Sequence, residues 1–92
     1  MTKAESDWLE LVASVGCVIC RRLGHGYTPA QIHHIAEGSG LRSNYAVCPL
    51  CPEHHTGANG FHSLRKQFLV QYRVPGETEW GLLVWTIEDV QR

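Results

Sequence analysis

The sequence lacks long apolar runs and an excess of positive charge. No stretch of it approaches the roughly 20 apolar residues that cross a bilayer, and residues 1–7 lack the apolar core of a signal peptide. We therefore expect a cytoplasmic protein without a membrane partner. The 8 lysines and arginines are balanced by 9 acidic residues, so the formal net charge is -1. This balance argues against a domain that binds nucleic acids through a strongly positive overall charge.

A local basic face is still compatible with this balance, because the positive charges are concentrated in the middle of the chain. They are Arg21, Arg22, Arg42, Arg65, Lys66 and Arg73, whereas most acidic residues lie nearer the ends. With 92 residues, the chain is long enough for one domain, residues 1–92. An apolar core of that size gives modest stability, which a structural metal ion or oligomerisation would increase.

The cysteines are the first group of residues that could form a metal or redox site. Its 4 cysteines form two Cys-x-x-Cys pairs, Cys17/Cys20 and Cys48/Cys51. In a reducing compartment, such pairs are typical of metal ligands rather than of disulfides. A thioredoxin-type redox site is the alternative, but neither pair lies in a recognisable βαβ pattern. The cysteines therefore favour a zinc site.

Histidine is the second such residue type, and most histidines are gathered in two short segments. These are the tandem pair His33-His34 and the segment Cys51-Pro-Glu-His54-His55. Imidazole is the commonest transition-metal ligand, and at neutral pH it is also well placed to accept a proton. Histidines gathered this closely indicate a site, and our working hypothesis is a metal-dependent nuclease.

The apolar pattern predicts an α+β fold. Spacing of three and four residues is typical of helices, whereas strict alternation is typical of strands. Ser6 would cap the first helix and Gly16 would end it. The expected elements are a helix over about residues 6–15, strands over 31–35 and 45–47 that form a β-hairpin, a helix over 61–72 and a final strand over 80–87.

These motifs, in this order, resemble those of the HNH endonucleases, and most closely those of the phage and prophage RecA-dependent recombination-enhancement (Ref-like) nucleases. The matching segments are Cys17-Val-Ile-Cys20, Gln31-Ile-His33-His34-Ile35, Pro49-Leu-Cys51-Pro-Glu-His54-His55, Gly57 with Gly60, His62, and residues 65–72. The resemblance implies a small zinc-stapled ββα-metal (His-Me finger) domain with its core motif over residues 17–72. An N-terminal helix and a C-terminal strand would flank this motif.

The resemblance also implies how the catalytic roles are divided. His33 would help to bind a catalytic divalent cation (Mg, Mn or Zn), and His34 would be the general base that deprotonates the attacking water in a one-metal mechanism. His55 would be a second ligand of that cation, with His62 as a competing or additional ligand. Asn44 is the candidate for the asparagine that orients the base, although it lies earlier than the usual spacing. A backbone carbonyl could take its place, or the role could be lost.

Two ligand sets are open for the structural zinc. The resemblance implies Cys17, Cys20, Cys51 and His54, with Cys48 as a strand residue that points at the core. Spacing alone favours a site of four cysteines, in which Cys48 replaces His54.

The leading hypothesis is a metal-dependent DNA endonuclease with little sequence preference. Its substrate would be double- or single-stranded DNA, with a recombinase filament as a candidate partner, and its oligomeric state is open. The phosphate contacts would come from Arg21, Arg22, Arg42, Arg65 and Lys66. A non-catalytic zinc module that binds nucleic acid or a protein is the second hypothesis. An oxidoreductase, with titratable thiols and no bound zinc, is the third.

Overall fold

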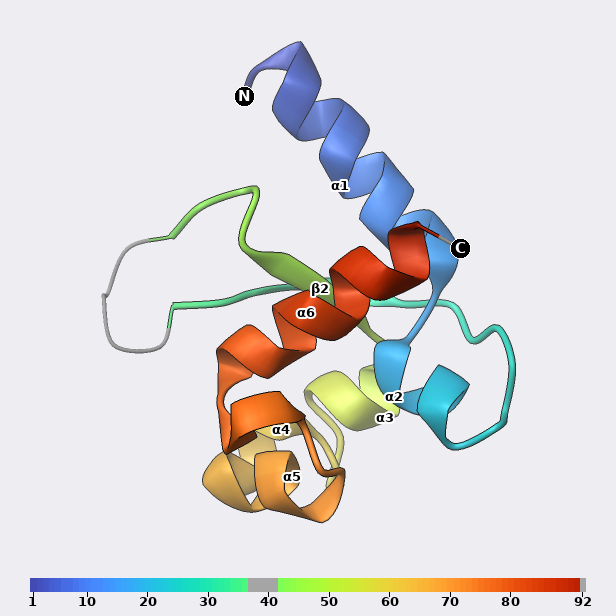
Figure 1. The fold of residues 1–92 in the computed structure, drawn as a ribbon, viewed down its shortest axis with the longest axis vertical. Helices are drawn as coiled ribbons and strands as arrows, with labels where there is room; N and C mark the ends of the chain where they lie inside the picture. Colours follow the sequence, from blue (N-terminus) through green and yellow to red (C-terminus); the bar gives the residue numbers. More distant parts are fainter. Residues whose placement is uncertain (37–41, 92) are drawn as a thin grey trace.

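The computed structural model describes residues 1–36 and 42–91, which form helices around a two-stranded antiparallel sheet (Figure 1). This arrangement confirms the predicted α+β class. The elements are α1 (Lys3–Val15), α2 (Val18–Arg22), β1 (Gln31–His34), β2 (Val47–Leu50), α3 (Pro52–His55), α4 (Phe61–Leu64), α5 (Lys66–Gln71), the 3-10 helix η1 (Pro75–Glu77) and α6 (Glu79–Val90). Within the described ranges, no helix has the length and hydropathy that a membrane crossing requires.

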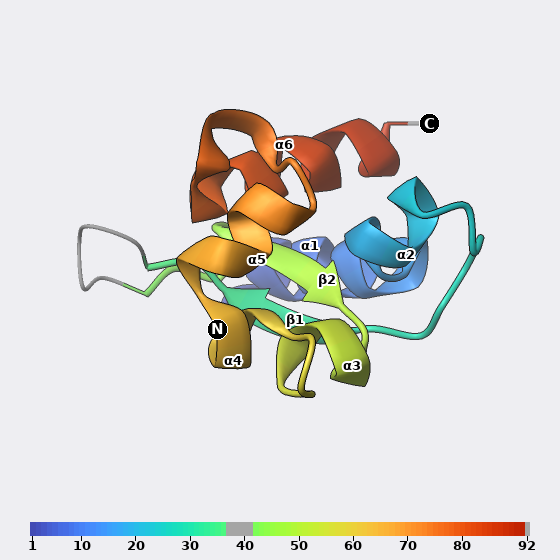
Figure 2. The same ribbon diagram turned by 90° about the horizontal axis from the view of Figure 1, so that it is seen from below.

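The hairpin of β1 and β2 lies at the centre, with α6 on one side and α3 and α4 on the other (Figure 2). Gln31 is paired with Leu50 and His34 with Val47. The returning strand therefore starts at Val47, not Tyr45, and it continues through Pro49 to Leu50, beyond the predicted end at residue 47. A strand of a two-stranded sheet has one unpaired edge, so proline is tolerated where its missing N–H would face away from the partner.

The first helix starts earlier than predicted. Its N-cap is Thr2 rather than Ser6, because Thr2 and Glu5 form a capping box. The Thr2 hydroxyl accepts a hydrogen bond from the Glu5 N–H at 3.1 Å, and Oε1 of Glu5 accepts one from the Thr2 N–H at 2.9 Å. Gly16 ends the helix as expected, with a φ of 80°.

The helix predicted over residues 61–72 is divided into α4 and α5. The break is at Arg65, whose φ of 54° and ψ of -124° are incompatible with a continuous helix. Phe61 before the break and Phe68 and Leu69 after it are all buried. Apolar side chains from both halves of the predicted helix therefore reach the core, but their spacing did not reveal the change of direction.

The C-terminal strand predicted over residues 80–87 is wrong, because this segment belongs to helix α6. The error arose because a short apolar run rich in aromatic and β-branched residues fits a buried strand and a buried helix equally well. The buried positions agree with a helix. Glu79, Leu82, Thr86 and Asp89 are buried, at the three- and four-residue spacing of a helix face.

Gly81 allows the start of α6 to pack tightly on the chain before it. A Cβ atom at Gly81 would overlap the backbone oxygen of Pro75 and lie 2.7 Å from Cγ1 of Val74. Because a backbone atom cannot yield as a flexible side chain does, we expect Gly81→Ala to lower the free energy of unfolding by about 1–3 kcal/mol. Urea unfolding followed by circular dichroism measures this change. Val84→Ala, at an exposed position of the same helix, is the control and should change stability by less than about 0.5 kcal/mol; equal stabilities of the two variants would contradict the close packing.

Candidate metal centres and cleft

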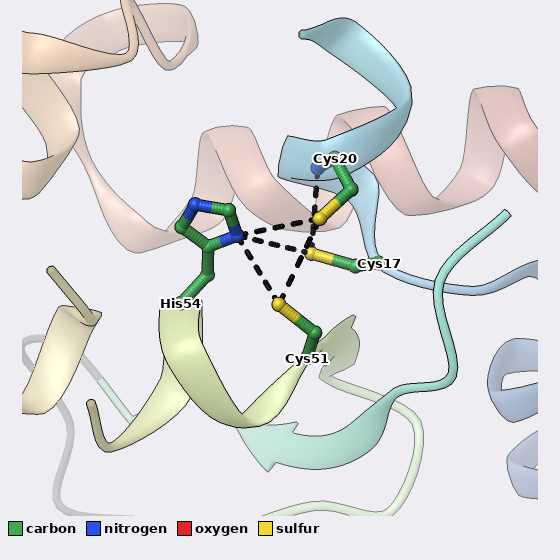
Figure 3. A group of neighbouring side chains, drawn as sticks. All are labelled: Cys17, Cys20, Cys51 and His54. Carbon is green, nitrogen blue, oxygen red and sulfur yellow. Dashed lines mark hydrogen bonds between the residues drawn. The ribbon is translucent and has the colours of Figure 1, made fainter. Parts of the chain in front are cut away.

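The first candidate centre gathers the side chains of Cys17, Cys20, Cys51 and His54, whose ligand atoms all lie within 4.8 Å of one another (Figure 3). All four residues are buried. The Sγ atoms of Cys20 and Cys51 are 3.7 Å apart, and Nδ1 of His54 is 3.2 Å from Sγ of Cys51. A tetrahedral zinc site with Zn–S bonds of about 2.3 Å has sulfur–sulfur edges of about 3.7 Å. This cluster could therefore hold a structural metal ion such as zinc.

Two short helices supply the four ligands in pairs. Cys17 is the N-cap of α2, and its Sγ accepts a hydrogen bond from the Cys20 N–H at 3.4 Å. Cys51 is the N-cap of α3, in which Pro52 is at a first-turn position that tolerates proline. One turn separates the members of each pair, so both ligands of a pair face the same side.

Protonation of this first centre depends on its burial. Burial raises the pKa of the Cys17 thiol to about 12, and it lowers the pKa of His54. The imidazole is consequently neutral at physiological pH, as a metal ligand must be. A bound cation would favour the thiolates and would displace their protons.

Cys48 lies apart from this centre. Its side chain is fully buried in the hydrophobic core, and burial raises the pKa of its thiol. Of the two ligand sets left open by the sequence, the structure assembles the one with His54 and leaves Cys48 in the core, as the resemblance implied.

The second candidate centre consists of His33 on β1, His55 on α3 and His62 on α4. Their ligand atoms lie within 4.8 Å of one another, and the Nε2 atoms of His55 and His62 are 3.2 Å apart. The structure thus brings both competing ligands, His55 and His62, to the same place as His33. Burial and the neighbouring imidazoles lower the pKa of His55 and of His62, which keeps these rings neutral and able to bind a cation.

Two polar side chains hold the rings of this second centre in place. Nδ1 of His55 donates a hydrogen bond to Oε1 of Gln31 at 2.8 Å, which leaves Nε2 for a cation. Nε2 of His33 is 2.7 Å from Oε2 of Glu79 and donates to it, which leaves Nδ1. A carboxylate or carbonyl oxygen on the far nitrogen is the usual way in which proteins orient metal-binding histidines.

Glu79 was missed in the sequence because it stands at the edge of the segment that we predicted as a strand. Glu79 and His33 are 46 positions apart in the sequence, so no short sequence motif contains both residues. A helix assignment for residues 79–90 would have marked Glu79 as an acidic residue on the apolar face, which is unusual unless it has a partner. The sequence therefore contained a sign that Glu79 has a partner, but only if residues 79–90 were assigned to a helix rather than to a strand.

Replacing Glu79 with glutamine is expected to weaken cation binding at the second centre about 10- to 100-fold. The amide can still accept a hydrogen bond from His33, but it lacks the negative charge that strengthens the imidazole as a ligand. Titration of the zinc-loaded protein with Mn²⁺ by calorimetry measures the affinity. Glu77→Gln, at an exposed position just before α6, is the matched control; an affinity equally unchanged in both variants would contradict the assignment.

His34 and Asn44 lie beside the second centre. His34 lines a cleft of about 440 Å³ together with Arg42 and the three histidines of the second centre. Nε2 of His34 is 3.0 Å from Oδ1 of Asn44, and a guanidinium nitrogen of Arg42 is 3.1 Å from Nδ1 of His34. Asn44 therefore contacts the predicted base with its own side chain, despite its early position in the sequence.

The arginines and the lysine predicted to contact nucleic acid differ in their surroundings. Arg42 faces the cleft. Arg22 is 2.7 Å from Oδ2 of the buried Asp89, and Arg21 approaches the same oxygen at 3.6 Å, so both guanidinium groups are engaged with α6. The Arg65 guanidinium lies over the Phe61 ring at 5.6 Å, and Lys66 donates to the backbone oxygen of Glu77. Nucleic-acid contacts by all five of these residues, Arg42 included, stay predictions.

Comparison with known proteins gave one result that covers nearly the whole chain. A family model described as "Recombination enhancement, RecA-dependent nuclease" matches residues 1–90. This range includes both candidate centres, the cleft and α6. No curated protein and no solved structure gave a significant match.

Proposed function

The chain belongs to the family of recombination-enhancement, RecA-dependent nucleases, and from this premise we propose that it hydrolyses DNA phosphodiester bonds in the cleft beside His34. The observation that carries the proposal is that a group of possible cation ligands lies next to a possible general base. Three imidazoles could hold a cation, and a fourth, His34, lies in the same cleft with its ring fixed by Asn44. We assign this arrangement to an HNH-type ββα-metal site.

A nuclease needs a group that takes the proton of the attacking water, and His34 is suited to that role. A neutral imidazole near its own pKa is an efficient general base. Water adds to the phosphorus as its proton passes to His34, and the bond between phosphorus and the leaving oxygen breaks. Arg42, at the same cleft, supplies a positive charge that can pair with a phosphate oxygen.

His33, His55 and His62 would hold the catalytic cation of this reaction. When bound there, a divalent cation would supply Lewis-acid chemistry by neutralising charge on the scissile phosphate and on the leaving oxygen. Gln31 and Glu79 keep two of the three rings oriented toward that position. Zinc held by Cys17, Cys20, Cys51 and His54 would have the separate role of stabilising the fold.

DNA is the substrate that the family description implies, and we propose a recombinase filament on DNA as the partner. The purified protein should be incubated with plasmid and with circular single-stranded DNA, in Mg²⁺ or Mn²⁺ and with EDTA as the control. Each reaction should be repeated with RecA filaments formed on the DNA. We expect cation-dependent strand cleavage under at least one condition. Absence of cleavage under all of them would contradict the proposal and favour a zinc-binding interaction module.

A further inference from the structure

We propose that Glu5, in the first turn of α1, is a positioning residue that determines which ring nitrogen of His34 carries the proton, acting through the side chain of Asn44. The effect on the His34 ring stands on the geometry alone. Its consequence for catalysis rests on the proposed function. Nothing in the sequence motifs pointed to Glu5, which lies outside the segment that carries the resemblance.

Three side chains from separate parts of the chain form a continuous series of hydrogen bonds. Nδ2 of Asn44 donates to Oε2 of Glu5 at 3.0 Å, and Oδ1 of Asn44 lies 3.0 Å from Nε2 of His34. The first contact joins residues 39 positions apart, and the second joins residues 10 apart. The side chain of Glu5 therefore reaches the predicted base through a single amide group.

The chemistry of the three groups permits only one arrangement of protons. An ionised carboxylate can only accept hydrogen bonds, so the NH₂ group of Asn44 must face Glu5. The Asn44 oxygen then faces His34, and because this oxygen also can only accept, Nε2 of His34 must carry the hydrogen. The lone pair of the neutral ring is consequently on Nδ1, where it accepts a hydrogen bond from the Arg42 guanidinium at 3.1 Å. When Arg42 pairs with a phosphate instead, this lone pair can take the proton of a water molecule.

Glu5 is itself held in place, which makes it an effective constraint. Its other oxygen, Oε1, accepts the Thr2 N–H at 2.9 Å in the capping box of α1. The hydrogen bonds from the Thr2 backbone and from Asn44 lower the pKa of Glu5, so the carboxylate is ionised at neutral pH. Trp8, one turn further along α1, donates from Nε1 to the backbone oxygen of Tyr45 at 3.1 Å and thereby fixes the segment that carries Asn44.

Without an acceptor-only partner, the Asn44 amide could rotate by half a turn at almost no cost in shape. Its NH₂ group would then donate to Nε2 of His34, and the ring proton would move to Nδ1. In that form Nδ1 has no lone pair for the water proton. In the free protein the guanidinium of Arg42, which can only donate to Nδ1, also opposes this exchange. Once Arg42 pairs with a phosphate, the carboxylate of Glu5 is the group that prevents it.

Glu5→Gln removes the constraint with little change in shape, because an amide can donate as well as accept. Long-range ¹H–¹⁵N correlation spectra at about pH 8, where a free imidazole is neutral, distinguish a ring protonated on Nε2 from one protonated on Nδ1. The His34 signals are identified by their absence in His34→Ala. We expect the Nε2–H form in the wild type and in Arg42→Ala, and a mixture of both forms when Glu5→Gln is combined with Arg42→Ala, which removes the donor to Nδ1. In Glu5→Gln alone we expect a fall in kcat of roughly 10- to 100-fold with KM little changed.

Two control variants separate positioning from helix stability. Glu10→Gln changes an exposed carboxylate of the same helix and should leave the spectra and the rate unaltered. Thr2→Val removes the side-chain half of the capping box but keeps Glu5, so it should loosen the start of α1 without altering the His34 signals.

Two results would overturn the inference. The first is a purely Nε2–H His34 ring in Glu5→Gln combined with Arg42→Ala, with wild-type kcat in Glu5→Gln alone. The second is a loss of rate in Glu5→Gln that Thr2→Val reproduces while the ring signals stay unchanged, since this would assign Glu5 a structural role only. If the wild type cleaves no DNA, the proposed function fails, and the spectra alone still decide whether Glu5 controls the His34 ring.

Discussion

Cys51→Ser is expected to abolish zinc binding and, with it, the cooperative unfolding transition of the protein. Cys51 is one of the four clustered candidate ligands, and it and His54, one helical turn away, are the two that come from α3 and its N-cap. The substitution therefore leaves His54 as the only strong ligand on that side of the site. Structural zinc contributes about 10–16 kcal/mol to folding in zinc-finger peptides. The total stability of a small domain is only about 5–15 kcal/mol. A chain of this length should therefore not remain folded without its zinc.

Zinc content by atomic spectroscopy and thermal unfolding by circular dichroism measure these effects. Cys48→Ala is the matched control, because Cys48 is buried in the core outside the cluster. It should keep stoichiometric zinc and lose only about 1 kcal/mol of stability. Loss of zinc in Cys48→Ala, together with its retention in His54→Ala, would show that the four-cysteine set is correct instead.

His34→Ala is expected to lower the rate of DNA cleavage about 10²- to 10⁴-fold, the usual contribution of a general base. His34 is half-buried at the end of β1, and its hydrogen-bond partners Arg42 and Asn44 lie in the segment that precedes β2. Its removal should leave the zinc cluster and the core intact. The loss should appear in kcat, since the ring acts on water and the phosphate contacts remain.

Cation titration separates this effect from loss of the metal. His34→Ala should bind Mn²⁺ with wild-type affinity, whereas His33→Ala should lose both binding and cleavage because it removes a ligand. Single-turnover cleavage of plasmid DNA measures the rate, and zinc content and thermal unfolding serve as controls for folding. Wild-type cleavage by His34→Ala would show that another group takes the proton.

Local spacing was enough to mark the cysteines and histidines as candidate ligands, but it favoured Cys48 as the fourth ligand of the first centre. The family resemblance implied His54 in its place and the members of the second centre. Cys17 with Cys20, and Cys51 with His54, are each three positions apart, and in a tight turn or short helix this separation alone directs both ligands to one ion. The alternation of a strand likewise gave His33 and His34 different surroundings. Such features depend on the backbone within a few residues, which a sequence displays directly.

Features that depend on distant parts of the chain could not be predicted in this way. Glu79 reaches His33 across 46 positions, and Glu5 reaches Asn44 across 39. Both contacts depend on how α1 and α6 pack on the hairpin, and the helical nature of α6 was itself hidden by an apolar run that fits either period. The sequence thus revealed the candidate ligands but not the carboxylates that orient the rings.

The shortness of α3 has a thermodynamic consequence for the two candidate centres. His54 and His55 are consecutive residues of this single turn, yet His54 belongs to the first candidate centre and His55 to the second. A shift of the turn that releases one ligand must also displace the other. Metal binding at one centre is therefore expected to change the affinity of the other centre through this shared turn. Such linkage is reciprocal: if an ion in the first centre raises the affinity of the second by some factor, an ion in the second raises the affinity of the first by the same factor.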